Sequence, residues 1–130
     1  MYEVKKALIV TDDSAKVKKM ANRIVKALGE AKILIKSASN FSGEDLLPAD
    51  AIFIGCEKPS PPSFKYLEIL FQHINLADRR CGIFTPSSEE AVLYMTGMVI
   101  NSDIKLNPVA LKEANSSFSK EWTAKTISEK

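Results

Sequence analysis

Two adjacent aspartates, Asp12 and Asp13, follow a short apolar run and come just before a helical pattern. Such a pair can bind a divalent cation together with water and a backbone carbonyl oxygen. Alternatively, one carboxylate caps the helix and the other is solvated, which is the interpretation we favour. In either case the pair opposes a phosphate at this helix N-terminus, because carboxylates within ~4–6 Å repel a second anion or take its place.

Cys56 also carries a group that could react, since it follows a predicted buried strand. Lys58 nearby could lower the pKa of its thiol and make it a nucleophile. The alternative, which we prefer, is a structural cysteine half-buried at the tip of the strand. A bridge to Cys81 is not expected, because the two lie at opposite ends of adjacent strands, ~15 Å apart at ~3.3 Å per residue. His73, the only histidine, falls on a predicted helix away from the loops, where we expect a surface role.

The composition is typical of an ordinary globular protein, with 130 residues that fit a single domain over 1–130. Of these, 45% are hydrophobic and 26% charged, and the net charge is +2. The apolar runs are too short for a secretion signal or for a membrane span of ~18 residues, so we expect a cytoplasmic protein without membrane binding. Exposed aromatics interleaved with basic residues are missing, so nucleic acid is not an expected partner. No spacing of nucleophilic or metal-ligating residues favours an enzyme.

Apolar runs and helical stripes alternate along the chain and predict the elements that position these residues. Compact β-branched runs predict buried strands at 7–10, 32–36, 50–55, 81–85 and 103–108. Apolar spacing predicts a first helix along the stripe from Val17 to Leu28, and further helices over 64–74, 86–99 and 119–130. The turn-rich segment 37–48 leaves little room for a full helix, and three prolines keep 56–62 irregular.

The ends of the first and last helices carry recognisable signals. Ser14 or Asp13 is the expected N-cap of the first helix, and Gly29 is its expected stop. Ser119 is the expected N-cap of the last helix, with Trp122 facing inward. This order of elements predicts a parallel sheet with helices on both faces. Ligands of such sheets bind at the carboxyl ends of the strands, where we expect the loops 11–16, 56–63 and 85–89 to meet.

A basic stripe runs along the first predicted helix. It consists of Lys16, Lys19, Arg23 and Lys26, at spacings that put all four on one helical face. A solvated face is the ordinary interpretation of such a stripe. The sharper one is a docking surface for an acidic protein partner.

Three passages of the chain resemble the flavodoxin-like family: "ALIV" followed by a loop and "KKMANRIV", then "EDLLPADAIFIGCEKPSPP", then "NLADRRCGIFT". The resemblance implies an α/β fold with a doubly wound, five-stranded parallel sheet of order 2-1-3-4-5 in a three-layer sandwich. It also implies an FMN site and electron transfer. The positions that would form this pocket are Thr11, Asp12, Asp13, Ser14, Ala15, Lys16, Cys56, Glu57, Lys58, Pro59, Thr85, Pro86 and Ser87.

The first loop departs from the family pattern, in which a hydroxyl-X-Thr-Gly-X-Thr sequence wraps the phosphate of FMN. Residues 11–16 read Thr-Asp-Asp-Ser-Ala-Lys, without a glycine to let the backbone approach a phosphate closely. The loops 56–62 and 85–90 contain no ring to stack on the isoalloxazine. We therefore expect a domain that has lost ordinary FMN binding and serves as a binding or accessory module. The alternative is an FMN-binding electron-transfer protein with an altered phosphate loop.

The opening "ALIVTDDSAKVKKM" also resembles response-regulator receiver domains, whose paired acids after the first strand hold Mg²⁺. Thr85 could match the hydroxyl after strand four, and "KLNPVALKEA" the Lys-Pro passage after strand five. However, Gly55 stands where the phosphate-accepting aspartate would be, and Asn107 where the lysine would be. This resemblance therefore implies a pseudo-receiver, a binding module of the same five-stranded fold.

Overall fold

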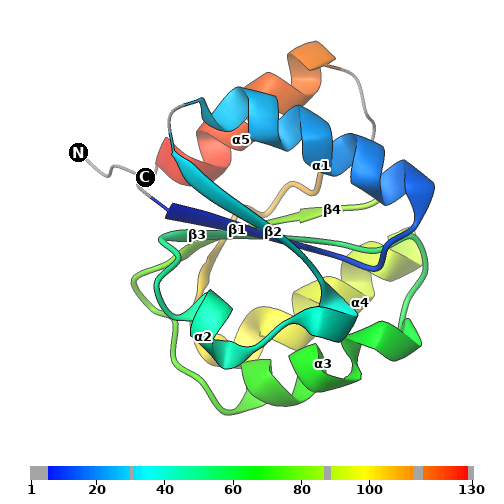
Figure 1. Ribbon diagram of the computed structural model, residues 1–130, viewed down its shortest axis with the longest axis vertical. Helices are drawn as coiled ribbons and strands as arrows, with labels where there is room; N and C mark the ends of the chain where they lie inside the picture. Colours follow the sequence, from blue (N-terminus) through cyan, green and yellow to red (C-terminus); the bar gives the residue numbers. More distant parts are fainter. Residues whose placement is uncertain (1–5, 30, 87–88, 113–115, 129–130) are drawn as a thin grey trace.

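Five parallel strands form a sheet of order β2-β1-β3-β4-β5, as predicted, in a computed structural model that describes residues 6–29, 31–86, 89–112 and 116–128 (Figure 1). The strands are β1 (Lys6–Thr11), β2 (Lys32–Ser37), β3 (Ala51–Gly55), β4 (Arg80–Phe84) and β5 (Lys105–Leu106). All four neighbouring pairs run parallel. Because β1 pairs with both β2 and β3, the chain changes its direction across the sheet at β1, and the loops after β1 and β3 leave the sheet side by side.

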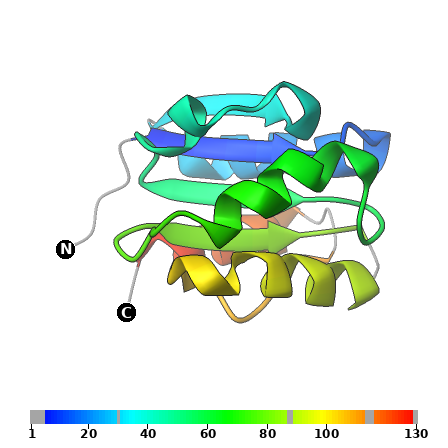
Figure 2. The same ribbon diagram turned by 90° about the horizontal axis from the view of Figure 1, so that it is seen from below.

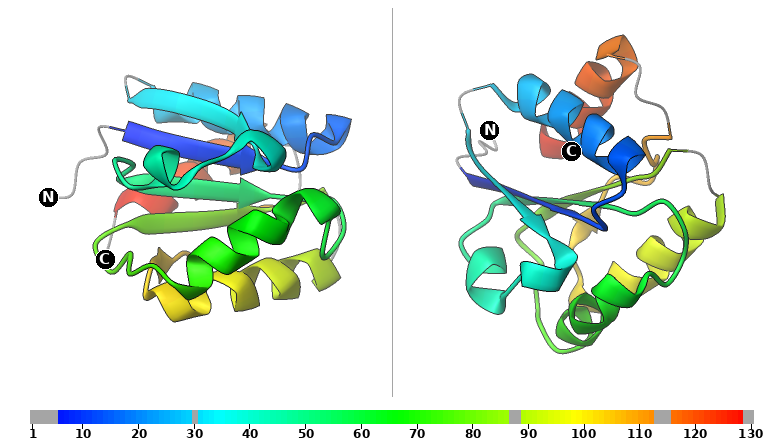
Figure 3. Two further views of the ribbon diagram at one scale, coloured as in Figure 1. Left: turned by 60° about the horizontal axis from the view of Figure 1, so that its bottom comes forward. Right: turned by 45° about the vertical axis from the view of Figure 1, so that its right-hand side comes forward.

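Helices cover both faces of the sheet (Figures 1, 2 and 3). One face carries α1 (Ala15–Leu28) and α5 (Ser116–Ser128), and the other carries α2 (Gly43–Leu46), α3 (Lys65–Gln72) and α4 (Glu89–Val99). Short 3₁₀ turns lie at Ala38–Asn40, Pro62–Phe64 and Ile100–Ser102. As expected, the segment 37–48 holds only a four-residue helix, and most of 56–62 is irregular. In the described ranges, no helix is both long enough and apolar enough to cross a lipid bilayer.

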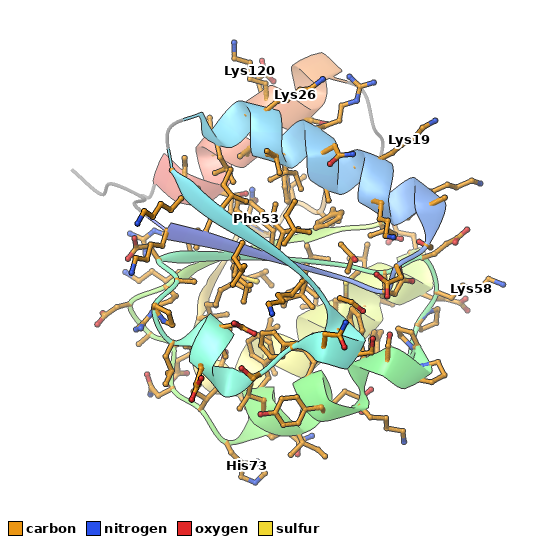
Figure 4. All side chains as sticks on the ribbon, in the orientation of Figure 1. Lys19, Lys26, Phe53, Lys58, His73 and Lys120 are labelled. Carbon is orange, nitrogen blue, oxygen red and sulfur yellow. The ribbon has the colours of Figure 1, made fainter. Side chains whose placement is uncertain are left out.

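The sheet separates two apolar clusters, because successive side chains of a strand point to opposite faces. Leu8 and Ile52 belong to the cluster under α2, α3 and α4, whereas Ile9 and Phe53 belong to the cluster under α1 and α5. Phe53 contacts Trp122 of α5, with ring centroids 5.8 Å apart, and lies between the sheet and the upper helices in Figure 4. Strands β1, β3 and β4 are therefore held from both sides, so the loops at their carboxyl ends start from rigid positions.

Helix α1 agrees with its predicted bounds. It begins after Ser14, and it ends at Gly29, whose φ of +66° is a left-handed conformation that glycine adopts without steric cost. The residues of its apolar stripe are buried against the sheet: Val17, Met20, Ala21, Ile24 and Leu28. The stripe fixes which face of α1 is turned outward.

Helix α5 corrects one prediction. It begins at Ser116, so Ser119 lies inside the helix and is not its N-cap. Ser119 precedes Trp122 by three positions, so the two residues share the inward helical face, and both are buried. The indole Nε1–H of Trp122 donates to the carbonyl of Val109 at 2.6 Å, which joins α5 to the segment after β5. The expectation that Trp122 faces inward is confirmed.

The fifth strand is shorter than the predicted 103–108 and spans only Lys105–Leu106. Asp103 takes a left-handed φ of +61° just before it, and Pro108 has no N–H to extend the ladder. Of the helix predicted over 86–99, the described part is Glu89–Val99, with two acidic residues in its first turn as expected.

Candidate functional site

Asp12 joins two of the loops that leave the carboxyl edge of the sheet. Its Oδ1 accepts a hydrogen bond from the backbone N–H of Ser14 at 3.1 Å, and its Oδ2 accepts one from the backbone N–H of Glu57 at 2.9 Å. Hydrogen bonds to a charged acceptor are roughly twice as strong as neutral ones. The half-buried carboxylate therefore holds the loop after β1 against the loop after β3, and the expectation that these two loops meet is confirmed.

Asp13 turns away from Asp12, toward strand β2. Its φ of +71° is left-handed, and its backbone N–H donates to Oγ1 of Thr11 at 3.3 Å. Its Oδ2 accepts a hydrogen bond from the hydroxyl of Ser37 at 2.6 Å, and its Oδ1 lies 4.0 Å from Nζ of Lys18. The two carboxylates thus serve different neighbours.

The expectation that one aspartate caps α1 is wrong, whereas the other half of it agrees with Asp13, which is exposed. Ser14 is the N-cap residue, and its side chain makes no capping hydrogen bond. The carboxylates of Asp12 and Asp13 instead accept hydrogen bonds from other loops, because the left-handed turn at Asp13 points them apart. The first turn of α1 contains no acidic residue, and Ala15 and Lys16 are exposed there.

Cys56 lies in surroundings that raise the pKa of its thiol, opposite to the hypothesis of activation by Lys58. Its side chain is fully buried, more than the half-burial expected at a strand tip. Burial, together with a smaller effect of the charge of Asp12, raises the pKa of the thiol from near 9 to about 12. Lys58 is exposed and points outward in Figure 4. Both cysteines are free, so the expected absence of a bridge between Cys56 and Cys81 is confirmed.

The remaining predicted pocket residues have varied surroundings. Thr85 is fully buried, and its backbone N–H donates to the carbonyl of Leu111 at 2.9 Å. Within the described part of the chain, Oγ1 of Thr85 and Oγ of Ser14 are buried without a hydrogen-bond partner. The exposure of the others is as follows: Glu57 and Pro86 are half-buried and Pro59 is exposed, while Ser87 lies outside the described residues.

Two rings close in sequence to these loops, Phe64 and Tyr94, belong to the α3–α4 layer. Phe64 is fully buried, and its ring centroid lies 6.3 Å from that of Tyr94. The phenol of Tyr94 donates to Oε2 of Glu68 at 2.5 Å. Burial raises the pKa of Tyr94 well above its usual range, and the hydrogen bond to Glu68 adds to the effect. Both rings are thus engaged within the protein.

Gly55 and Asn107, the two positions compared above with receiver domains, both have close contacts within the protein. A Cβ on Gly55 would lie 2.3–2.7 Å from ring atoms of Phe84, so there is no room for an aspartate unless this ring moves. The amide of Asn107 donates to Oγ1 of Thr126 at 2.9 Å and accepts the N–H of Val109 at 3.0 Å. In the described ranges, no group of three or more histidine, cysteine or acidic residues gathers around Asp12 and Asp13 or elsewhere, and the cation site stays a prediction.

Ser37, which the sequence did not single out, belongs to this edge of the sheet. It pairs in register with Thr11, and its hydroxyl contacts both Asp13 and Ser39. A hollow of about 300 Å³ opens beside it toward α1, lined in part by Thr11, Asp13, Lys18, Asn22, Ile35 and Ser37. The location of Ser37 could have been predicted, because parallel pairing brings the end of β2 to the same edge of the sheet as the end of β1.

The basic stripe of α1 is exposed along its whole length. The four residues Lys16, Lys19, Arg23 and Lys26 are all on the solvent side of the helix, opposite its buried apolar stripe. Lys19 and Lys26 point away from the sheet in Figure 4. His73 is exposed, as expected.

No protein-family model and no curated protein sequence matches the chain. Solved structures do match it. The chain is similar to oxidised flavodoxin 2 from Bacillus cereus, with a TM-score of 0.77, 18% identity and coverage of 88% of this chain and 94% of that one. A short-chain flavodoxin associated with a PDU bacterial microcompartment matches with a TM-score of 0.83, 10% identity and coverage of 96% and 97%. A Fusobacterium nucleatum flavodoxin bound to flavin mononucleotide matches with a TM-score of 0.66, 8% identity and coverage of 85% and 77%. The chain has a flavodoxin-like fold.

Proposed function

We propose that this flavodoxin-like domain does not hold FMN through the loop after β1 and serves as a binding module for other proteins. The observation that carries the proposal is the position of Asp12. Its carboxylate accepts the backbone N–H groups of Ser14 and Glu57, at the corner where the phosphate of a flavin would be expected from the resemblance. The loop therefore carries its own anion.

Charge repulsion opposes the binding of a phosphate at this corner. Two unit charges 4 Å apart repel each other by about 4 kcal/mol at an effective dielectric constant of 20. This repulsion corresponds to roughly a thousandfold loss of affinity for each pair of like charges. A phosphate would also have to displace Asp12 from two charge-assisted hydrogen bonds to gain the same donors. Of the cations near the helix start, Lys18 already lies 4.0 Å from Asp13, so Lys16 alone is left to offset the charge of Asp12.

The flavin ring would find few stacking partners near the same loops. Of the rings close in sequence to these loops, Phe64 is fully buried, Tyr94 is hydrogen-bonded to Glu68, and Phe84 is fully buried beside Gly55. Stacking would require these rings to leave a packed layer, at the cost of their buried contacts. This supports the loss of ordinary FMN binding.

The surface that we propose for a partner is the basic stripe of α1. Four cations on one exposed helical face attract an acidic protein surface, and the attraction weakens with salt. NMR titration with poly-L-glutamate tests this part of the proposal. Shifts should gather on Lys19 and Arg23, decrease with added salt, and disappear in Lys19→Glu/Arg23→Glu. Equal shifts at Lys105, on the far edge of the sheet, would contradict it.

A second candidate function is electron transfer with FMN in an altered loop. It is favoured by the hydroxyls of Ser14 and Thr85, which are buried without partners in the described residues and could bind a polar ligand. It is also favoured by the similarity to a flavodoxin that was solved with flavin mononucleotide. A pseudo-receiver has less support, because Asp12 and Asp13, the paired acids of that resemblance, contact different elements, Glu57 and Ser37.

An FMN titration followed by flavin absorbance and fluorescence separates the two candidates. We expect no saturable binding to the wild-type protein in the micromolar range. Asp12→Asn removes one charge and keeps one acceptor oxygen, so any affinity that exists should increase. Glu44→Gln, an exposed change on α2, is the matched control and should have no effect. Saturable binding of FMN by the wild-type protein at micromolar or lower concentration would overturn the proposal and support the electron carrier.

A further inference from the structure

Strand β2 forms an open edge of the sheet. It spans Lys32–Ser37, and among the described strands it pairs with β1 alone (Figures 1 and 3). At the opposite edge, β5 has two residues. An edge strand presents backbone N–H and C=O groups that can accept a further strand. Six residues are a common strand length, whereas two are too few for a stable ladder.

The side chains of β2 leave apolar surface on both faces of this edge. Leu34 is 42% exposed and Ile35 is 47% exposed. Because they are consecutive, they point to opposite faces of the sheet. In buried parallel sheets, both faces are normally covered. Here the connection from β2 to β3 contains only the four-residue helix α2, which covers too little of the edge to bury Leu34.

Each of these two side chains lines a hollow. Leu34 lines one of about 340 Å³ on the α2 side, together with Lys6, Leu8, Asp45, Pro48 and Ala49. Ile35 lines the hollow of about 300 Å³ on the α1 side that also contains Ser37. We call β2 and these two hollows the β2 edge. An extended segment that adds to a sheet sends alternate side chains to the two faces, so a hollow on each face gives it two places to bind.

The charges around the β2 edge are mainly positive. Lys6 and Lys32 are exposed at one end of the strand. Lys36 and Lys18 lie at the other end, where they contact Asp45 at 3.9 Å and Asp13 at 4.0 Å. Four cations thus stand against three carboxylates, since Asp50 accepts the backbone N–H of Lys6 at 3.1 Å, and they flank an apolar centre. The complementary segment is apolar in the middle and acidic at its ends, above all at the end that meets Lys6 and Lys32.

We propose that the β2 edge binds an extended, acidic-ended segment of a partner protein as an added strand. A second copy of this chain fits the edge less well. A β2–β2 pair centred on Leu34 would place Lys32 of each copy opposite Lys36 of the other, and like charges across a pair of strands are destabilising. The inference concerns backbone pairing at β2 and does not depend on whether FMN binds.

The test uses a labelled synthetic peptide, Glu-Asp-Val-Ile-Val-Ile-Asp-Glu, titrated with the full chain and followed by fluorescence anisotropy. We expect saturable binding, with amide shifts and slowed hydrogen exchange along Lys32–Ser37. Leu34→Glu and Ile35→Glu should each weaken binding roughly tenfold or more. Each variant puts a carboxylate, of the same sign as the acids of the peptide, into a hollow that takes an apolar peptide side chain. Two control peptides should bind at least about tenfold more weakly. One has lysines in place of the acids, and the other has proline in place of the first isoleucine, which removes a backbone donor.

Leu93→Glu is the matched control, because Leu93 is an exposed leucine on α4, away from this edge. It should leave peptide affinity unchanged, and circular dichroism should show that all three variants are folded. The proposal is overturned by an absence of saturable peptide binding, by an equal loss in Leu93→Glu, or by shifts outside β2 and its hollows. A dimer in sedimentation that Leu34→Glu abolishes would also overturn it, in favour of a second copy.

Discussion

The backbone N–H of Glu57 donates to Oδ2 of Asp12 at 2.9 Å, although the two residues are 45 positions apart in the chain. The other oxygen of this carboxylate accepts the N–H of Ser14. One half-buried side chain therefore organises the corner where the loops after β1 and β3 meet. Its loss would leave two backbone donors without their acceptor, and such groups are costly when water reaches them poorly.

Asp12→Ala should lower the free energy of unfolding by about 1–3 kcal/mol, the usual cost of leaving buried donors unsatisfied. Asp13→Asn is the matched control, because asparagine tolerates the left-handed φ of Asp13, whereas alanine would add backbone strain. The hydrogen bond of Asp13 to Ser37 is exposed, so we expect a loss of at most about 1 kcal/mol. Urea denaturation followed by circular dichroism measures both. Equal losses in the two variants would mean that Asp12 has no special role at this corner.

The two thiols should react slowly in the folded protein. Burial raises the pKa of both Cys56 and Cys81 from near 9 to about 12. At pH 8 the thiolate fraction then falls roughly a thousandfold relative to the unfolded chain, and the thiolate is the reactive form. Ellman's reagent, added in buffer and in denaturant, measures the ratio. Rapid modification of Cys56 in buffer would restore the hypothesis of a reactive thiol.

Stability should decline in alkaline solution because of the same shifts. A thiol whose pKa is raised by folding keeps its proton between about pH 9 and pH 12, while the unfolded chain loses it. The free energy of unfolding therefore falls as the pH rises through this window, by about 1.4 kcal/mol per pH unit for each thiol. Denaturation at several pH values measures the slope, and Cys56→Ala/Cys81→Ala should reduce it. An unchanged slope in the double variant would assign the decline to other groups, such as Tyr94.

Much of the fold could be predicted from local patterns in the sequence. The apolar stripe of α1 and the glycine at position 29 determine that helix, because periodicity and a left-handed stop are both local. The start of α5 could not be predicted in this way. Serine is a common N-cap residue when only local sequence is considered. Ser119, however, lies one helical turn before Trp122 on the same inward face, and it is buried there.

The candidate site was predictable in its location and less so in its contacts. That loops 11–16 and 56–63 meet follows from the parallel order of the strands. Which carboxylate faces which loop depends on the left-handed φ of +71° at Asp13, a conformation that aspartate adopts only occasionally and that neighbouring residues do not reveal. Ser37 was missed for a related reason, since only the register of β2 against β1 brings it to Asp13.

Two glycine substitutions should have opposite effects on stability. A Cβ on Gly55 would lie 2.3 Å from a ring atom of Phe84, so Gly55→Ala should cost about 1–3 kcal/mol through overpacking. Nothing lies within 4 Å of a Cβ on Gly97, inside α4, so Gly97→Ala should stabilise the protein by about 0.5–1 kcal/mol.

Chemical denaturation of the two glycine variants and of Gly55→Ala/Phe84→Leu completes the test. The smaller leucine should recover part of the loss, because it withdraws the ring from the space above Gly55. If Gly55→Ala were as stable as Gly97→Ala, the ring of Phe84 could not occupy that space in solution. The end of β3 would then have room for a side chain beside the loop after β1.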